Sequence, residues 1–289
     1  MTFRTLFDAI AGNDRLNFLL TNRLPRRALS RMMGRLSAIE HPMVSIPALA
    51  AFRFFCAPDL SEARATRFAS LRDCFVRELA PGRRPLDARA DILTSPSDGI
   101  VMAAGRIERG QLLQVKGSTY ALAELLRDAD RAAALEGGCY ATLRLTAGMY
   151  HRFHAPHDGR IAAVAHVAGD AWNVNPPALA RVPALYCRNE RAAIRFELAR
   201  GGHAVTLVAV AAILVAGIRI RGIDLPADRD HAEPWHAACD IPLSKGAEIG
   251  WFEHGSTIVV LAPPGFDLDP GRSVGSRLRM GEPLMRLPD

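Results

Sequence analysis

The sequence predicts an α+β protein in which a helical N-terminal segment precedes a mainly β domain of barrel or sandwich character. Before residue 90, apolar residues recur at helical spacing, and after it short apolar runs alternate with turn residues. Of the 289 residues, 49% are hydrophobic and 23% are charged, which supports a packed core and excludes a disordered chain. We therefore expect two regions, 1–90 and 91–289.

The N-terminal region is expected to hold several separate helices. Apolar residues recur at helical spacing through 3–36, with breaks at Gly12-Asn13 and Pro25. A second apolar patch, Ile46–Phe55, is broken by Pro47 and Arg53. A more regular helix is predicted over Leu60–Leu79, where Pro81-Gly82 ends it.

Charge is distributed unevenly along the chain. Residues 1–90 carry fifteen arginines, no lysine and eight acidic residues, whereas residues 91–289 are close to neutral, and the whole chain has a net charge of +6. Amphipathic helices that carry arginines are typical of segments that lie in a membrane interface, although the same pattern occurs on ordinary surface helices. No basic motif with interleaved aromatic residues is present, so nucleic acid is not an expected partner.

The region after residue 91 reads as a series of strands with one helical interruption over Ala121–Ala134. A P-x-D-G turn occurs twice, at Pro96–Gly99 and at Pro156–Gly159, and each copy opens a strand. Short apolar runs separated by turn residues are typical of β-barrels and β-sandwiches. The expected strands are Gly99–Ala104, Gln111–Val115, Cys139–Leu145, Arg160–Val167, Ala193–Leu198, Ala204–Val215 and Thr257–Leu261.

Several classes of protein are disfavoured. Five scattered cysteines without a C-x-x-C pair argue against a disulfide framework and a cysteine-built metal site. The longest uncharged apolar run, Ala204–Ile218, is shorter than a membrane-spanning helix, and charged residues interrupt every early apolar stretch that could form a signal peptide. We therefore expect a soluble or peripheral intracellular protein.

Two short segments could carry chemistry. In Tyr150–His157, three histidines recur at every third position, but Pro156 disfavours a continuous helix and a strand would not place them on one face, so acid–base work is favoured over a metal site. Gly255-Ser256-Thr257 leads directly into a predicted strand. The same three letters occur at Gly117-Ser118-Thr119, so this triplet alone identifies nothing.

The order and spacing of several motifs together resemble the phosphatidylserine decarboxylase family, and this resemblance runs from about residue 68 to 283. The most specific signature is Tyr150-His151-Arg152-Phe153-His154 with Pro156 and Asp158-Gly159. The other matching segments, in chain order, are Phe75–Leu79 with Pro81–Pro85, Ser97-Asp98-Gly99, Val174-Asn175-Pro176, Arg188–Arg191, Lys245-Gly246 with Glu248–Phe252, Gly255-Ser256-Thr257 and Arg279–Glu282.

The resemblance implies a proenzyme that cleaves itself between Gly255 and Ser256 into a β chain, 1–255, and an α chain, 256–289. Ser256 would become a pyruvoyl group, the only cofactor expected, which forms a Schiff base with phosphatidylserine and releases CO2 to give phosphatidylethanolamine. By motif match, Ser256 is the nucleophile, His154 is the base, and Asp98 orients that base, as in a Ser–His–Asp triad. His151 is expected to deliver a proton during decarboxylation, and no metal is expected.

Two departures from the family pattern stand out. His254 lies where a smaller or apolar residue is usual, one residue from the predicted scissile bond, and could change the rate or pH dependence of processing. Ala216-Gly217 followed by Arg219 also departs from the small-residue pattern that is usual in the family at this point. Gly117-Ser118-Thr119 fits a segment of the family that is not cleaved.

The resemblance also implies partners and a location. We expect the enzyme to bind phosphatidylserine in an anionic membrane, as a peripheral protein on the cytoplasmic side of the cell membrane, to consist of its own two chains and to form a homodimer. Three alternatives stay open: a serine hydrolase using Asp98, His154 and Ser256, which lacks a G-x-S-x-G elbow, a non-catalytic lipid-binding β module, and a pyruvoyl enzyme acting on a soluble amino acid.

Overall fold

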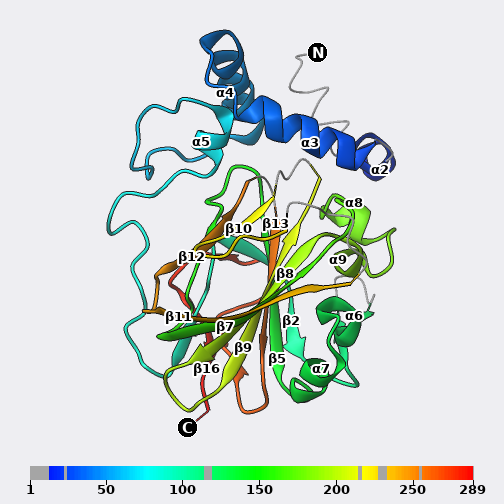
Figure 1. The fold of residues 1–289 in the computed structure, drawn as a ribbon, viewed down its shortest axis with the longest axis vertical. Helices are drawn as coiled ribbons and strands as arrows, with labels where there is room; N and C mark the ends of the chain where they lie inside the picture. The colour runs from blue at the N-terminus through cyan, green and yellow to red at the C-terminus, as the bar shows by residue number, and fades with distance from the viewer. Residues whose placement is uncertain are drawn as a thin grey trace.

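The computed structural model describes residues 13–22, 25–113, 119–213, 217–226, 233–253 and 256–288. Helices come first and strands follow (Figure 1). The N-terminal helices are α2 (Asp14–Asn22), α3 (Arg26–Ser37), α4 (Pro42–Cys56) and α5 (Leu71–Phe75). The later helices are α6 (Leu122–Leu126), α7 (Ala129–Ala134), α8 (Pro176–Leu179) and α9 (Leu185–Arg188).

An antiparallel eight-stranded sheet forms the centre of the strand-rich part, in the order β11-β7-β8-β9-β13-β5-β2-β15. Its strands are β2 (Gly99–Arg106), β5 (Cys139–Leu145), β7 (Gly159–Val167), β8 (Arg191–Leu198), β9 (Ala204–Ala211), β11 (Trp235–Leu243), β13 (Ser256–Ala262) and β15 (Arg277–Leu278).

Three smaller sheets complete the strand-rich part, in the orders β10-β12-β6, β1-β16-β14 and β3-β4. Their strands are β1 (Ile92–Thr94), β3 (Gln111–Leu113), β4 (Thr119–Ala121), β6 (Arg152–His154), β10 (Ile218–Ile220), β12 (Glu248–Phe252), β14 (Asp267–Leu268) and β16 (Pro283–Arg286).

The prediction of a mixed helix and strand protein that is mostly sheet is confirmed. The expected barrel is not: the order of the eight-stranded sheet has two ends, β11 and β15, so the described strands do not close into a ring. The predicted boundary near residue 90 falls in the segment 76–91 between α5 and β1 and stays a prediction.

The long helix expected over Leu60–Leu79 is wrong. The left-handed backbone of Ala57 ends α4, and the Asp59 carboxylate then accepts bonds from the Ser61 backbone and hydroxyl, which forms a turn. Residues 62–64 pair with residues 78–80, since the amide of Arg64 donates to the carbonyl of Glu78. Only five residues, Leu71–Phe75, are helical, behind the Ser70 N-cap.

Two other helical predictions also needed correction. The helix expected over Ala121–Ala134 is split into α6 and α7 because Arg127 has a left-handed conformation and Asp128 caps a new helix. The break expected at Pro47 is absent: Pro47 lies inside α4. Because proline has no N–H, one backbone hydrogen bond is missing at Pro47, yet the helix continues to Cys56.

The N-terminal helices lie across one end of the strands (Figure 1). Polar contacts attach them: the Arg26 guanidinium is 2.6 Å from the Asp170 carboxylate and 3.6 Å from the centre of the Trp172 ring. The Asn175 amide donates to the Asn17 side chain at 2.7 Å. Among the described residues, no helix is both long enough and apolar enough to cross a membrane.

Candidate functional site

Ser256 is the first residue of β13, which lies between β5 and β9 in the large sheet. Its direct partners across the strands are Leu145 on β5 and Ala211 on β9. From Ile258 to Ala262 the strand is buried, so its start is held by a rigid centre. Gly255 and His254 lie outside the described residues, as does Ser118 of the second G-S-T triplet.

The topology connects the strand that begins at Ser256 with the strand of the histidine motif. Strand β13 pairs with β5, and β12, which precedes it, pairs with β6, which follows β5. The amide of Phe252 donates to the carbonyl of His151 at 3.0 Å. Residues 146–151, which join β5 to β6, therefore begin next to Ser256, the strand partner of Leu145.

His154 is held by hydrogen bonds at both of its ring nitrogens. Its Nδ1 is 2.9 Å from the carbonyl oxygen of Gly246, and because a carbonyl can only accept, Nδ1 carries the proton. Its Nε2 is 2.9 Å from the Tyr150 hydroxyl and accepts that hydrogen. Burial lowers the pKa of His154, against smaller opposing effects that include the bond to Gly246. The ring therefore offers a lone pair at neutral pH.

Asp98 is held by an arginine. Its two carboxylate oxygens accept from Nε and a terminal nitrogen of Arg84, at 2.8 and 2.6 Å, and the amide of Met280 donates to it at 2.9 Å. Among the described residues no hydrogen bond joins Asp98 to His154, so Gly246 orients the ring in this structure and the orienting role of Asp98 stays a prediction.

Arg84 and Tyr150 are site residues that the sequence reasoning did not assign. Tyr150 is buried and its ring centre is 5.9 Å from the Arg84 guanidinium carbon, so it stands between the Asp98–Arg84 pair and His154. Tyr150 opens the histidine signature and Arg84 lies within the Pro81–Pro85 motif. Both were visible in the sequence, but only the fold shows their contacts.

His151 is fully buried, with Nδ1 2.8 Å from the carbonyl of Met149 and its ring centre 4.0 Å from that of Phe75. Phe75 belongs to the wall of a large cavity, described next. His151 therefore lies directly behind that wall, and its predicted part in proton delivery stays a prediction.

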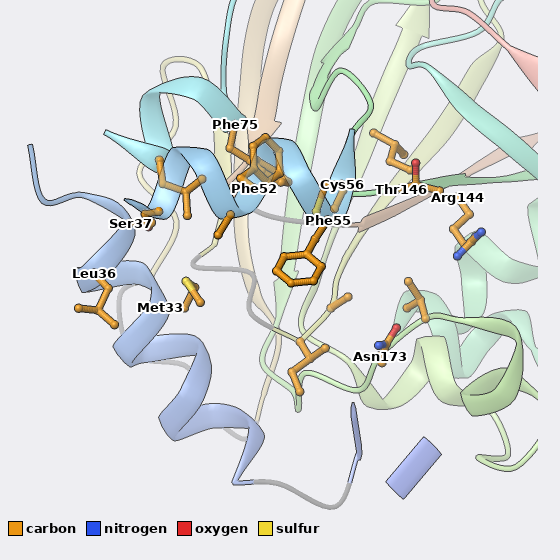
Figure 2. Close-up of a pocket in the computed structure, with 18 of the residues that line it drawn as sticks. Met33, Leu36, Ser37, Phe52, Phe55, Cys56, Phe75, Arg144, Thr146 and Asn173 are labelled. Atoms are coloured by element: carbon orange, nitrogen blue, oxygen red, sulfur yellow. The ribbon is translucent and has the colours of Figure 1, made fainter. Parts of the chain in front are cut away.

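An apolar cavity of about 690 Å³ lies between the N-terminal helices and the end of the large sheet (Figure 2). That volume is within the roughly 300–1,000 Å³ of ligand sites. Figure 2 shows Met33 and Leu36 of α3 on one side, Arg144 and Thr146 on the other side, and Phe55 of α4 between them. Leu145, the strand partner of Ser256, also lines it.

A smaller polar cavity of about 410 Å³ adjoins the apolar one, and Cys56 and Thr146 line both. The polar cavity is bordered by Asp98, Arg84 and Tyr150. Gly148 allows this arrangement, since a Cβ there would overlap the carbonyl oxygen of Cys56 at the end of α4. One end of the space therefore suits a charged group and the other suits hydrocarbon.

Within the described part of the chain, no group of three or more His, Cys, Asp or Glu side chains is arranged to hold a metal ion. The three histidines of the signature are used differently: His157 has both ring nitrogens against backbone carbonyls, of Asp158 and Ala90, while His151 and His154 contact the groups described above.

Comparison with known proteins decides the family. The sequence model of the family described as phosphatidylserine decarboxylase matches residues 71–286. The chain belongs to the phosphatidylserine decarboxylase family. It is therefore a decarboxylase, a carboxy-lyase, as the sequence predicted.

Relatives agree over nearly the whole length. The chain is 38% identical to a protein of Anaeromyxobacter sp. (strain K) over 281 residues, covering 94% of this chain and 98% of the relative. It is 38% identical to a protein of Bordetella pertussis, covering 90% of each, and 36% identical to one of Shewanella pealeana, covering 96% of this chain and all of the relative. All three are named phosphatidylserine decarboxylase proenzyme.

Proposed function

We propose that this chain is a proenzyme that cuts itself between Gly255 and Ser256 and then decarboxylates phosphatidylserine to phosphatidylethanolamine. The observation that carries the proposal is the pair of adjoining cavities, one polar and one apolar, that meet at Thr146, next to the strand partner of Ser256. An amphiphile with a charged head and hydrocarbon tails matches that pair of environments.

Self-cleavage requires a nucleophile, a base and an open carbonyl. The Ser256 hydroxyl would lose its proton to the base and attack the carbonyl carbon of Gly255, which replaces the peptide bond by an ester. Loss of the Ser256 α-proton then expels the Gly255 carboxylate and leaves a dehydroalanine, which tautomerises and reacts with water to release ammonia. His154 is the base in this proposal, with Nε2 free to accept once Tyr150 moves aside.

The start of β13 suits the product of this cleavage. Pairing begins at Ser256 and runs to Ala262, so a cut before Ser256 would sever no strand and the new terminus would stay anchored between β5 and β9. A pyruvoyl group at this terminus would supply the electron sink that decarboxylation needs. Asp98 and Arg84 would keep the polar cavity charged and ordered, and His151 would return a proton to the substrate carbon.

The N-terminal helices would place the enzyme at its substrate. Of the ten large hydrophobic side chains that are exposed among the described residues, eight lie on α2, α3 and α4. We propose that this face of region 1–90 lies in an anionic membrane surface, on the cytoplasmic side, while region 91–289 carries the chemistry. The eight exposed hydrophobic side chains on these helices are Leu16, Leu19, Met32, Leu36, Met43, Ile46, Phe54 and Phe55.

The assembly is also part of the proposal. The two cleavage products would stay together, and the enzyme would form a homodimer.

The first test is Ser256→Ala, with Ser118→Ala as the matched control because it removes the serine of the other G-S-T triplet. Under denaturing mass spectrometry, the parent and Ser118→Ala should give chains 1–255 and 256–289, with the short chain one ammonia lighter than a serine terminus predicts. Ser256→Ala should stay intact, since it lacks the nucleophile.

An intact parent chain would favour the serine hydrolase or the non-catalytic lipid-binding module. Cleavage at Ser118 would refute the assignment of Ser256. The remaining alternative is a pyruvoyl enzyme that acts on a soluble amino acid. Flotation with phosphatidylserine liposomes distinguishes it from the proposed enzyme, since only an enzyme that binds the lipid surface should float with the liposomes.

A second test concerns the apolar cavity. Ala48 lines it from α4, and Ala48→Trp should fill part of the volume. We expect about a tenfold higher KM for dioleoyl phosphatidylserine and no change for glycerophosphoserine, which has no tails to accommodate. An equal effect on both substrates would show that tails do not occupy this cavity. Ala133→Trp, at an exposed position on α7 away from the cavity and from the N-terminal helices, is the control.

A further inference from the structure

One arginine at the cavity is not used by the mechanism above. Arg144 lies on β5, directly before Leu145, and is the cross-strand partner of Thr257. It is the single charged residue among those that line the apolar cavity. In Figure 2 it lies on the opposite side of the cavity from Met33 and Leu36. A cation is therefore placed at one wall of an otherwise apolar space.

Arg144 has no partner for its charge among the described residues. Its Nε is buried and makes no hydrogen bond. Burial lowers the pKa of Arg144, and the Tyr186 phenol, rather than a carboxylate, acts in the opposite direction. Most other arginines of the site are paired or bound, as with Arg84 by Asp98 and Glu62. A half-buried unpaired guanidinium costs folding free energy and points to a missing anion.

Two further polar groups beside Arg144, the hydroxyls of Thr257 and Tyr186, have no strong hydrogen-bond partner. The Thr257 hydroxyl and the Tyr186 hydroxyl are fully buried, and neither makes a hydrogen bond of good geometry, although the two lie close enough to interact with each other. Burial raises the pKa of Tyr186 to about 12, and Thr257 and Arg144 partly offset that rise. The buried Nε of Arg144 and these two hydroxyls thus gather next to the first residues of β13, with hydrogen-bonding capacity to spare.

We propose that Arg144 binds the phosphodiester of the glycerophospholipid substrate, at the boundary between its headgroup and its tails. The position fits, because Arg144 lines the same cavity as Leu145, which is the next residue on β5 and the strand partner of Ser256. A guanidinium matches an anionic phosphodiester in charge and in hydrogen-bond geometry. The inference rests on the proposed function, whose substrate carries this group.

The phosphodiester is a better ligand for Arg144 than the carboxylate that is lost. A carboxylate gives up its charge during decarboxylation, so a cation bound to it would stabilise the reactant more than the transition state. The phosphodiester is unchanged by the reaction. Its contact with Arg144 would strengthen binding equally in both states and should act on KM rather than on kcat.

The test uses full-length self-cleaved enzyme with dihexanoyl phosphatidylserine. Arg144→Gln should raise KM about ten- to a hundredfold with kcat nearly unchanged, and Arg144→Lys should recover part of the loss, since hydrogen bonds to charged groups contribute about 1.5–3 kcal/mol. Arg195→Gln, at a strand arginine paired with Glu197 and away from the cavity, should leave KM unchanged.

A binding measurement separates this inference from the proposed function. Dihexanoyl phosphatidylmethanol has the phosphodiester but neither the amine nor the carboxylate of the substrate. By titration calorimetry, Arg144→Gln should bind this compound more weakly than the parent does, and it should bind dihexanoylglycerol with unchanged affinity. This readout does not need decarboxylation. Thermal melting adds a check, because removing an unpaired cation should leave Tm equal or higher.

Three results would overturn the inference. The first is an unchanged KM in Arg144→Gln. The second is a fall in kcat at constant KM, which would place the residue at the reacting centre. The third is binding of inorganic phosphate as tight as that of phosphatidylmethanol, which would indicate a site for a free anion. A parent enzyme that binds phosphatidylmethanol through Arg144 but releases no CO2 from phosphatidylserine would contradict the proposed function alone.

Discussion

Replacing Arg84 with methionine should lower the free energy of unfolding by about 3–5 kcal/mol, because it leaves buried carboxylates without their cation. The Arg84 side chain is only 6% exposed and bonds both oxygens of Asp98 as well as Glu62, at 2.8 Å. Glu62 keeps a second contact with Arg279, but Asp98 keeps only the amide of Met280. The main loss therefore falls on Asp98.

Urea unfolding in the Ser256→Ala background measures this loss on a single uncleaved chain. The control is Arg64→Met, since Arg64 pairs with Glu78 at 3.0 Å but is 70% exposed and should change stability by about 1 kcal/mol or less. The double variant Arg84→Met with Asp98→Asn should recover part of the loss, because it removes the stranded charge. If Arg84→Met costs no more than Arg64→Met, the pair is effectively solvated and cannot order the polar cavity.

The sequence was a good guide where one short pattern determines one element. The central strands could be predicted because short apolar runs between turn residues, such as Cys139–Leu145, admit little else. The family could also be predicted, because ordered motifs such as Tyr150–His154 are matched over most of the chain.

What could not be predicted depends on contacts between distant segments. The helix expected over Leu60–Leu79 gives way to a pairing of residues 62–64 with 78–80, which no local propensity reveals. The same applies to the site: Arg84 meets Asp98 across fourteen residues, and Gly246 meets His154 across ninety-two. The spacing of motifs predicted Asp98 and His154 as site residues, but it predicted neither the part of Arg84 nor these hydrogen bonds.

Replacing His154 with glutamine should slow self-cleavage about a hundredfold or more, which is the usual contribution of a positioned general base. Glutamine preserves the size and polarity of the side chain but has no basic nitrogen at neutral pH. The rate is measured as the loss of intact chain with time in freshly folded protein. His157→Gln is a matched control, since His157 is equally buried but both of its ring nitrogens face carbonyls.

The pH dependence provides an independent check on the same residue. Burial lowers the pKa of His154, so the neutral, basic form persists to more acidic pH than for an ordinary histidine. The cleavage rate of the parent should therefore be constant from pH 8 to the ordinary histidine value of about 6.5 and should fall only below it. Tyr150→Phe should speed cleavage if the phenol merely occupies Nε2, and should slow it if the phenol relays the serine proton. A cleavage rate that already falls between pH 8 and 7 would mean that the essential base is a different group with a higher pKa.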